Sequence, residues 1–367
     1  MKRSTIAVIN KNNIRFNFRR IKVLAPNSKV MAIVKANAYG HGIDEVAKVL
    51  YEENVDMFGV AFVDEAVRIR ELGIKTPILV FFPSNDEESE LICKHNLQVV
   101  ASSYRTLEAL SKVAVKHNVR IKAHLFIETG MNREGISHLR APEFMKKCSN
   151  LENIDINGVC THFATAPNNI EFAQKQLDIF LKTLNNLKQD GYKFEYVHAS
   201  NSAGIVNLPQ AHFNIVRPGM SLYGYPPEKH LLSKLQVRPV MTLKTNVFLT
   251  HRIKKGDSVG YSQLYVADKD TTIATLPIGY GDGYPRTLTG KGECLINGKR
   301  YDIVGSVCMD ACMVDVGDDD VKLGDEVILI GNQGSETITA FDIAEKIGSI
   351  PYEITTAISA RVPRTYM

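Results

Sequence analysis

The stretch Val30-Met-Ala-Ile-Val-Lys35-Ala-Asn-Ala-Tyr-Gly-His-Gly42 is the most informative part of this chain. Its five consecutive apolar residues, 30–34, predict a short buried strand. Lys35 stands at the end of that strand and is followed at once by polar and glycine residues. An ammonium in apolar surroundings is costly, so its pKa falls readily. A lysine of lowered pKa is a good nucleophile towards an aldehyde, and the position of Lys35 therefore predicts a Schiff-base lysine. A strand-end lysine that merely reaches solvent is the alternative interpretation.

Length and composition limit the classes of protein to consider. The chain has 367 residues, a length that predicts two domains. Its net charge of +4 is small for this length. It has no basic run of the kind that binds nucleic acid and no apolar run long enough to span a membrane. The basic N-terminus is not followed by the apolar stretch of a secretory signal. The six cysteines form no CxxC pair, which favours reduced thiols over a metal site. We therefore expect a soluble cytoplasmic protein with no metal, nucleic-acid or membrane partner.

The first two thirds of the chain alternate short apolar runs with longer amphipathic segments. The apolar runs predict eight strands, at 29–34, 57–61, 77–81, 98–101, 122–127, 158–161, 196–199 and 214–216. The segments between them predict helices at 44–53, 64–72, 86–95, 106–117, 142–149 and 171–189, with Asp44 and Thr106 as N-caps. Eight strands that alternate with helices are what a (β/α)8 TIM barrel requires, whereas a doubly wound sheet needs fewer. The sequence thus predicts an α/β fold of the barrel type.

After Pro239 the helical spacing gives way to alternating runs separated by turn signals. These runs predict strands at 241–253, 272–277, 293–297, 299–304, 309–316 and 326–330, followed by a short helix at 340–347. The early strand 4–9 is expected to pair with this second, mostly β domain. We therefore predict a barrel over 10–237 and a β domain made of 1–9 and 238–367.

Polar residues follow five of the predicted barrel strands, and the active site of such a barrel lies at the carboxyl ends of its strands. They are Lys35, Arg133, His162, Asn201 with Ser202, and Arg217. Any one of these alone would more often be a cap, a turn or a salt bridge, but their common placement predicts one site. Ser202 and the backbone N–H groups around Gly219 and Met220 are well suited to a phosphate, because glycine permits close approach and a helix N-terminus adds a favourable dipole.

Four motifs together resemble the alanine racemase family over essentially the whole chain. The run 34–42 resembles the cofactor-lysine motif of the bacterial enzymes. Val259-Gly260-Tyr261, the run 278–286 (Ile-Gly-Tyr-Gly-Asp-Gly-Tyr-Pro-Arg) and the run 305–310 (Gly-Ser-Val-Cys-Met-Asp) match the same family in order and spacing. The resemblance implies a homodimer with shared active sites that interconverts L- and D-alanine and supplies D-alanine for cell-wall peptidoglycan.

The resemblance also implies a role for each matched residue. Lys35 would hold pyridoxal 5′-phosphate covalently and act as one base, and Tyr261 of the partner subunit would be the opposing base. Arg217 would face the pyridine nitrogen, with His198 supporting it. Residues expected to contact the cofactor phosphate or lie beside it are Tyr39, Asn201, Ser202, Gly219, Met220 and Tyr352. Residues expected around the substrate are Arg133 and the Met309 backbone at its carboxylate, with Tyr280 and Asp310 at the entrance. His162 would bind the cofactor and lie near Tyr261.

The chemistry explains why two bases are needed. The α-proton of a free amino acid is too weakly acidic for a protein base, and an imine to pyridoxal delocalises the developing negative charge. Racemisation then requires a base on each face of the planar carbon, one to remove a proton and one to deliver it. Because guanidinium does not give up its proton, Arg217 would keep the pyridine nitrogen unprotonated and limit side reactions.

The run 123–130 departs from the family pattern at two positions. Phe126 stands where many members carry a carbamylated lysine that binds the arginine matched to Arg133, and Glu128 stands where aspartate is usual. Arg133 must then find another acceptor, for which Glu128, a backbone carbonyl or a chloride ion are the candidates. These changes leave serine or a broader set of amino acids open as substrates.

Two other functions have sequence features that argue against them. A decarboxylase of the same architecture usually carries glutamate opposite the pyridine nitrogen and a catalytic cysteine in the β domain, where this chain has Arg217 and Tyr261. A non-catalytic pyridoxal-phosphate carrier consists of the barrel alone, so the second domain argues against it. Release of carbon dioxide from diamino acids would identify the first, and cofactor binding without exchange of any α-proton would identify the second.

Overall fold

Eight short parallel strands form the first sheet of the computed structural model, which describes residues 3–83 and 86–367. Their order around the sheet is β10 (Ile215–Val216), β2 (Lys29–Ile33), β3 (Met57–Val60), β4 (Ile78–Val80), β5 (Gln98–Ala101), β6 (Ile121–Glu128), β8 (Ile154–Cys160) and β9 (Tyr196–His198). The short β7 (Ile136–Ser137) pairs with β6. The sheet nearly closes, because the Arg217 N–H donates to the Ser200 carbonyl at 2.9 Å and thereby links the segments that follow β10 and β9. The predicted barrel is confirmed.

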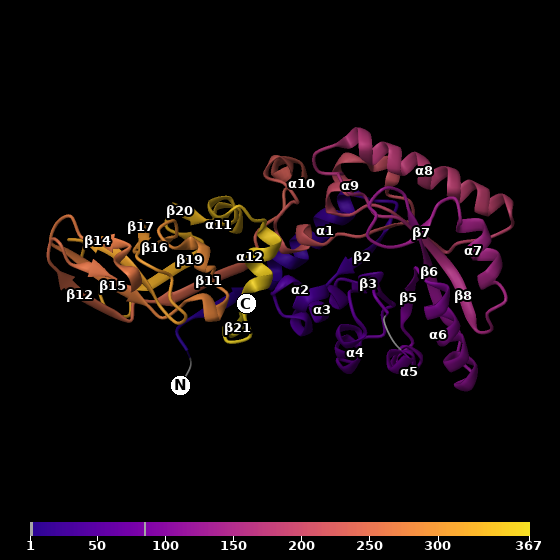
Figure 1. The fold of residues 1–367 in the computed structure, drawn as a ribbon, viewed down its shortest axis with the longest axis horizontal. Helices are drawn as coiled ribbons and strands as arrows, with labels where there is room; N and C mark the ends of the chain where they lie inside the picture. The colour runs from indigo at the N-terminus through magenta and orange to yellow at the C-terminus, as the bar shows by residue number, and fades with distance from the viewer. Residues whose placement is uncertain (1–2, 84–85) are drawn as a thin grey trace. The chain divides into compact units, whose positions relative to one another are not determined.

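Helices alternate with these strands and cover them from outside (Figure 1). They are α3 (Ile43–Glu52), α4 (Val63–Glu71), α5 (Asp86–Lys94), α6 (Tyr104–Lys116), α7 (Ala141–Cys148), α8 (Ile170–Gln189) and the short α9 (Ser202–Asn207). Both predicted N-caps are wrong. Asp44 lies inside the first turn of α3 and pairs with Arg68 at 2.6 Å, and Thr106 lies inside α6, whose N-cap is Ser103.

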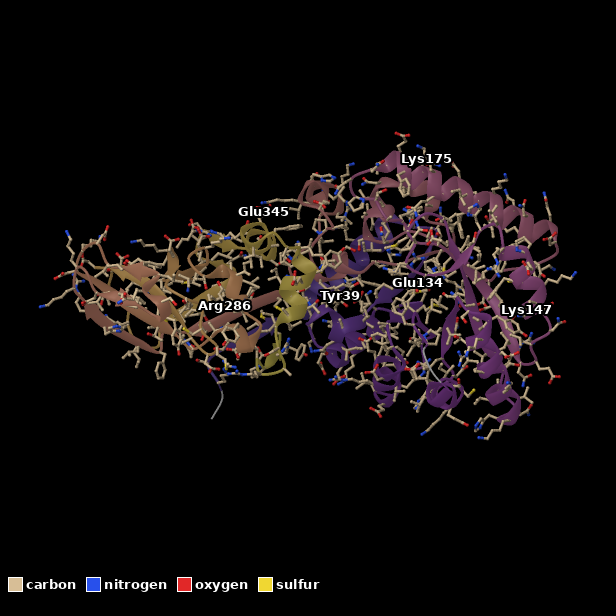
Figure 2. All side chains as sticks on the ribbon, in the orientation of Figure 1. Tyr39, Glu134, Lys147, Lys175, Arg286 and Glu345 are labelled. Atoms are coloured by element: carbon tan, nitrogen blue, oxygen red, sulfur yellow. The ribbon has the colours of Figure 1, made fainter. Side chains whose placement is uncertain are left out.

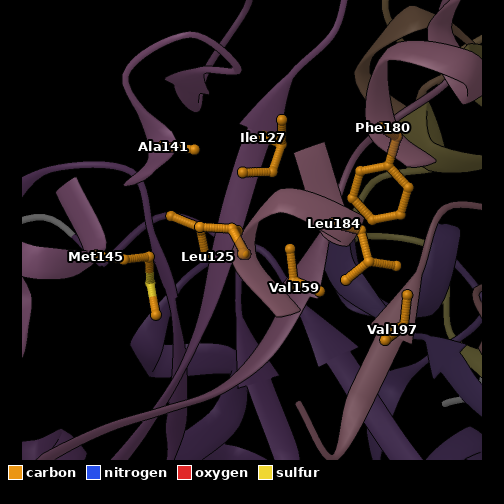
Figure 3. Packing of buried hydrophobic residues seen from close by; sticks show 9 residues of the cluster. Leu125, Ile127, Ala141, Met145, Val159, Phe180, Leu184 and Val197 are labelled. Carbon is orange, nitrogen blue, oxygen red and sulfur yellow. The ribbon is translucent and has the colours of Figure 1, made fainter. Parts of the chain in front are cut away.

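The barrel core lies between its strands and the helices around them. Apolar side chains of β6, β8 and β9 pack against α7 and α8 in one cluster, made of Leu125, Ile127, Ala141, Met145, Val159, Phe180, Leu184, Leu187 and Val197 (Figure 3). Burial of such side chains contributes roughly 1.5–3 kcal/mol each. Because β2 to β5 are buried on both faces apart from Lys29, their sequences are almost continuously apolar rather than alternating, and the buried Gln98 of β5 is the exception.

Several elements were not predicted. Helix α1 (Lys11–Leu24) has the apolar spacing Ile14, Phe18 and Ile21, but eight of its residues are polar or charged. Its buried Asn17 donates to the carbonyls of Leu222 and Arg238, at 3.0 and 2.8 Å, so a polar side chain anchors this helix. Other short helices are η1 (Pro209–Ala211), η2 (Met220–Tyr223), η3 (Lys229–Leu231), α10 (Leu232–Leu235), η6 (Arg286–Leu288) and α12 (Pro351–Ala357).

The second sheet has ten strands, most of them antiparallel. Its order is β12 (Leu249–Ile253), β15 (Thr271–Leu276), β18 (Cys312–Gly317), β17 (Lys299–Val304), β16 (Glu293–Ile296), β19 (Glu326–Gln333), β11 (Met241–Asn246), β1 (Ile6–Ile9) and β21 (Arg364–Tyr366), with β20 (Glu336–Ile338) beside β19. The hairpin β13 (Ser258–Val259) and β14 (Tyr265–Val266) stands apart, and α11 (Ala340–Ile347) is the predicted helix. The expected pairing of the early strand is confirmed, since Ile6–Ile9 pairs with β11.

One predicted strand of this domain is wrong. The run 241–253 is two strands, β11 and β12, which are not neighbours in the sheet. The chain breaks between them because the N–H groups of Val247 and Phe248 donate to the carbonyls of Asp325 and Thr275, each at 2.9 Å. The alternation of apolar and polar residues over 241–253 does not indicate this break.

The chain divides into two compact units. One contains residues 14–38 and 43–238, and the other contains 3–13, 39–42 and 239–367. No helix of the described residues is long and apolar enough to cross a membrane. The described residues also contain no cluster of side chains that could hold a metal ion. All six cysteines are unpaired thiols, and five of them are buried.

Candidate active site

Lys35 follows β2 and begins a turn of unusual handedness. Ala36, Asn37 and Ala38 have φ of 52°, 54° and 53° with ψ near 50°, and Tyr39 continues with φ of 53°. Left-handed helical backbone costs an L-residue roughly 1–2 kcal/mol, so four in succession require compensation. The Ala38 N–H donates to the Val34 carbonyl at 2.8 Å, and the Asn37 Oδ1 accepts from the Ile43 N–H at 2.9 Å. The turn thereby joins the catalytic-lysine candidate to the start of α3.

Glu65 provides a further compensation for this turn. Its carboxylate accepts from the Ala36 N–H at 2.5 Å through one oxygen. The other oxygen accepts from the N–H groups of Ala61 and Phe62, at 2.8 and 3.3 Å. Hydrogen bonds to an ionised acceptor are stronger than neutral ones. A single carboxylate from the first turn of α4 therefore ties together the segments that follow β2 and β3.

The electrostatic surroundings of Lys35 favour its neutral form. Burial lowers the pKa of Lys35, and the positive charge of Arg133 lowers it further. The carboxylates of Glu65 and Glu134 act in the opposite direction. The amine is thus more easily deprotonated than an ordinary lysine, as a nucleophile or a base requires.

Arg217 lies at the end of β10 with its side chain almost fully enclosed, at 4% exposure. Its Nη2 donates to the carbonyls of Thr161 and Ala199, at 2.7 and 3.0 Å. Its Nη1 donates to the His198 Nδ1 at 2.5 Å. No carboxylate in the described part of the chain forms an ion pair with it, and burial lowers its pKa to about 10. The guanidinium remains a cation at neutral pH and presents a fixed positive group inside the barrel.

His162 lies against the other side of this guanidinium. Its Nδ1 is 3.2 Å from the Arg217 Nη2, whose two hydrogens also serve the Thr161 and Ala199 carbonyls, so the ring nitrogen can only accept a share of one of them. The proton of the neutral ring is then on Nε2. Desolvation and the charges of Arg217 and Arg133 lower the pKa of His162 well below its usual value. His162 is therefore a neutral donor on the barrel rim.

The predicted phosphate residues come together after β9 and β10. Asn201 caps α9, and its Oδ1 accepts from the N–H groups of Ala203 and Gly204, at 3.2 and 3.0 Å. The Ser202 Oγ accepts from the Gly219 N–H at 3.0 Å and lies 2.9 Å from the Ser221 Oγ. Met220 follows at the start of η2. Hydroxyl and amide donors are thus gathered beside Ser202, whereas Asn201 uses its side chain to cap the helix.

Arg133 has a partner that the sequence did not predict. Its guanidinium pairs with the Glu134 Oε1, at 2.7 Å from Nη2 and 3.1 Å from Nε. Glu128 does not pair with Arg133, and its two oxygens accept from the Gly130 and Asn132 N–H groups. Glu134 lies within the barrel unit (Figure 2).

Phe126 fills the space beneath this loop. The ring is buried, and a Cβ placed at Gly135 would lie only 2.4 Å from its Cδ1. Phe126 therefore packs against the loop that carries Arg133 but offers the guanidinium no acceptor. The apolar side chain and the acidic neighbour Glu134 explain how Arg133 is held without a lysine at position 126.

The other compact unit gathers a second group of predicted residues. Tyr261 begins η4 (Tyr261–Gln263), and Tyr280 begins η5 (Tyr280–Asp282). A hollow of about 620 Å³ is lined by Tyr261, Ser262, Leu264, Tyr280, Arg286, Ser306, Val307, Cys308, Met309, Asp310 and Ala311. The Tyr261 side chain is 74% exposed. Figure 2 labels Arg286 within this unit.

The backbone and charges of this second unit hold the hollow in shape. The Met309 carbonyl accepts from the Gly281 N–H at 2.9 Å, which joins the turns that carry Tyr280 and Asp310. Asp310 pairs with Arg361 at 2.6 Å, and Arg361 also lies 3.4 Å from Asp282, which is fully buried. In the same unit the rings of Tyr39 and Tyr352 lie 5.9 Å apart.

The structure thus collects the sequence-predicted residues into two groups. The barrel group consists of Lys35, Arg133, His162, His198, Asn201, Ser202, Arg217, Gly219 and Met220, and the second group consists of Tyr39, Tyr261, Tyr280, Met309, Asp310 and Tyr352. Sequence reasoning missed Glu65 and Glu134. The position of Glu65 at the third residue of a helix was a usable signal, because acidic residues there often bind backbone N–H groups.

Comparison with known proteins bears on what these groups do. The chain matches the family model described as alanine racemase, N-terminal domain, over residues 9–227 and the model of the C-terminal domain over 240–366. This chain belongs to the alanine racemase family. It is 41% identical to the alanine racemase of Halothermothrix orenii over 367 residues, covering 99% of this chain and 97% of that protein. It is 42% identical to the enzyme of Thermodesulfovibrio yellowstonii, covering 100% and 99%.

Solved structures agree with this membership. An alanine racemase of Clostridium difficile 630 is 36% identical and superposes with a TM-score of 0.94, covering 100% of this chain and 96% of that one. The alanine racemase of Bacillus anthracis with bound L-Ala-P is 35% identical with a TM-score of 0.93 and the same coverage. Members of the alanine racemase family are isomerases that interconvert L- and D-alanine, and the matches span both domains of this chain. Neither the decarboxylase nor the carrier interpretation is supported.

Proposed function

We propose that this chain racemises alanine with pyridoxal 5′-phosphate, using Lys35 of one subunit and Tyr261 of a partner subunit as the two bases. The observation that carries the proposal is the half-buried Lys35, whose pKa is lowered, on the same barrel rim as the buried cation Arg217. Family membership supplies the reaction.

The donors present in the barrel suit this cofactor. Lys35 offers an amine for its aldehyde. The Ser202 hydroxyl and the N–H groups of Gly219 and Met220 would donate to its phosphate, with the Gly219 N–H exchanging its present bond to the Ser202 Oγ for one to the phosphate. Arg217 offers a buried, permanently charged donor for the pyridine nitrogen, and no carboxylate of the described residues competes for it through an ion pair. When bound, the cofactor supplies the electron sink that makes the α-proton acidic. Tyr39 and Tyr352 remain the sequence-based candidates for further phosphate contacts.

Lys35 acts as the base on one face. Its lowered pKa lets the amine exist neutral closer to physiological pH, where it can accept a proton from the α-carbon and return it. The left-handed turn and Glu65 hold the backbone that follows the lysine, so this backbone does not have to be ordered during the reaction.

Tyr261 acts as the base on the other face, and we propose that it comes from a second copy of the chain. A phenol that is 74% exposed is surrounded by bulk water and cannot control proton delivery alone. Large apolar side chains around it are also exposed, among them Leu264 at 62%, Val266 at 54% and Met309 at 51%. Apolar surface gathered at one place is typical of a protein interface. A homodimer would cover this surface and bring the phenol to the barrel rim of its partner.

The remaining rim residues orient the substrate. Arg133, held by Glu134, presents its other N–H donors to the substrate carboxylate, with the Met309 backbone as a second contact. His162 is a neutral donor beside Arg217 and can stabilise the Tyr261 phenolate through Nε2–H. Tyr280 and Asp310 line the hollow through which the amino acid would enter.

We also propose where and why the reaction occurs. D-alanine is a precursor of cell-wall peptidoglycan, so the enzyme would supply it from L-alanine inside the cell. Six unpaired cysteine thiols are typical of proteins of the reducing cytoplasm.

The test uses the purified protein with pyridoxal phosphate and each L-amino acid in turn, with the enantiomers separated by chiral chromatography. We expect D-alanine from L-alanine at the highest rate. The two bases are distinguished in deuterium oxide, where Tyr261→Phe should exchange the α-proton of one alanine enantiomer only. Exchange of both enantiomers by Tyr261→Phe would contradict the assignment of the second base.

A further inference from the structure

A chain of buried hydrogen bonds runs from Arg217 into the barrel. The Arg217 Nη1 lies 2.5 Å from the His198 Nδ1, and the His198 Nε2 lies 2.8 Å from the His124 Nδ1. The His124 Nε2 then lies 2.9 Å from the Gln98 Oε1. The two histidines are fully enclosed, and Gln98 is 7% exposed. The chain therefore connects residues of β5, β6 and β9 with Arg217 after β10, and all four residues are buried.

Arg217 fixes the direction of every bond in this chain. A guanidinium only donates, so the His198 Nδ1 must accept and its proton must be on Nε2. That Nε2–H donates to the His124 Nδ1, which places the second proton on the His124 Nε2. The last N–H donates to the Gln98 carbonyl oxygen. Only one tautomer of each ring satisfies all three bonds.

Both rings must be neutral for this arrangement. Burial lowers the pKa of His124 to about 3, although the nearby Glu195 carboxylate acts in the opposite direction. Burial and the charge of Arg217 lower the pKa of His198 well below its usual value. A protonated ring would carry N–H on both nitrogens and would place a donor against a donor.

The space around His124 is built for an imidazole in this position. A Cβ placed at Gly158 of the adjacent strand β8 would lie 2.4 Å from the His124 Cγ. On another side the ring stacks on Tyr196, with centroids 5.3 Å apart and 23° between the planes. The ring is therefore held in place by packing as well as by its hydrogen bonds.

We infer that Gln98 and His124 are positioning residues, which lock His198 in the one tautomer that can accept from Arg217 and so hold the guanidinium in its orientation. This inference rests on the proposed function for its catalytic consequence, but the tautomers themselves do not. Gln98 touches neither Arg217 nor His198 through a hydrogen bond of this chain, so its influence must pass through both imidazoles.

The first test is ¹⁵N NMR of the cofactor-free protein at neutral pH, with its histidines labelled by ¹⁵N. The signals of each ring are assigned by comparison with a variant in which that histidine is replaced. Two-bond proton–nitrogen correlations distinguish the two neutral tautomers from the charged ring. We expect the Nε2–H tautomer for both His124 and His198. A charged ring, or a proton on the His198 Nδ1, would overturn the inference whether or not the protein racemises alanine.

The second test is Gln98→Met, which keeps the length of the side chain but removes the acceptor. We expect His198 to lose its single tautomer. We expect kcat of the loaded enzyme to fall roughly tenfold, which is the lower end of the effect of removing the hydrogen-bond partner of a metal-bound histidine. The matched control is Ser111→Ala, which removes a bond of 2.6 Å to the Glu152 carbonyl elsewhere in the barrel unit. The control should change neither readout. An unchanged His198 tautomer together with an unchanged kcat in Gln98→Met would refute the inference. If that variant does not fold, the tautomers seen in the NMR spectrum of the wild type decide the question.

Discussion

Glu65 offers a sharp test of how the barrel holds its lysine. The substitution Glu65→Gln keeps the size of the side chain but leaves one acceptor oxygen where the carboxylate has two. The carboxylate accepts from Ala36 at 2.5 Å and from Ala61 at 2.8 Å, on different oxygens. In the variant one of these N–H groups must face an NH2 group. A hydrogen bond to a charged acceptor contributes roughly 1.5–3 kcal/mol, so we expect the free energy of unfolding to fall by about 2 kcal/mol.

The same substitution should change the titration of the lysine. Glu65 raises the pKa of Lys35, so its removal should lower that pKa further. Stability is measured by urea unfolding of the cofactor-free protein, and the pKa by the pH dependence of acylation of the Lys35 amine. The matched control is Asp64→Asn, which removes the same charge from the neighbouring, exposed position of α4. An equal loss of stability in both variants, or a Lys35 pKa that does not fall in Glu65→Gln, would refute this account of the turn.

Three further predictions follow from the charges of the site. Burial lowers the pKa of His124 to about 3 and also lowers that of His198, so the unfolded chain binds more protons than the folded chain below pH ~6.5. On acidification these two rings should therefore lower the free energy of unfolding by up to about 2.7 kcal/mol per pH unit. The measurement is the pH dependence of urea unfolding, compared between wild type and His124→Phe. The pKa of Lys35 is lower in the folded chain than in the unfolded chain, so stability falls as pH decreases between the two values. Cofactor-free Lys35→Met should therefore be more stable than wild type at neutral pH in the same assay, and a less stable variant would contradict the lowered pKa. Because Glu134 already binds Arg133, the racemisation rate of the wild type should not respond to chloride at fixed ionic strength. The rate of Glu134→Gln should rise with chloride. Stimulation of the wild type would show that Glu134 does not satisfy Arg133 by itself.

Much of the barrel could be predicted because its physics is local. The strands β2 to β4 are apolar after Lys29 since both of their faces are buried, and Lys35 stands out at the end of β2. The polar residues at the strand ends share one rim because parallel strands all end on the same side. The contacts of Arg217 with His162 and of Ser202 with Gly219 follow from that geometry.

Features that depend on distant partners could not be predicted. Helix α1 is too polar to be recognised until Asn17 meets the carbonyls of Leu222 and Arg238. The left-handed turn after Lys35 contains two alanines, which prefer other backbone conformations, so the local bond from Ala38 to Val34 needs the tertiary contact with Glu65 to select it. The choice of Glu134 rather than Glu128 as the partner of Arg133 depends on which backbone N–H groups the loop directs at Glu128.

The two-subunit active site is the central claim, and mixing two inactive variants tests it most directly. Lys35→Ala and Tyr261→Phe would be purified separately, mixed in equal amounts under conditions of proven subunit exchange, and assayed for D-alanine formation. Random pairing makes half of the dimers hybrids, each with one intact site, so we expect about a quarter of the wild-type activity. If the mixture stays as inactive as its components while subunits exchange, Lys35 and Tyr261 do not act together from different chains.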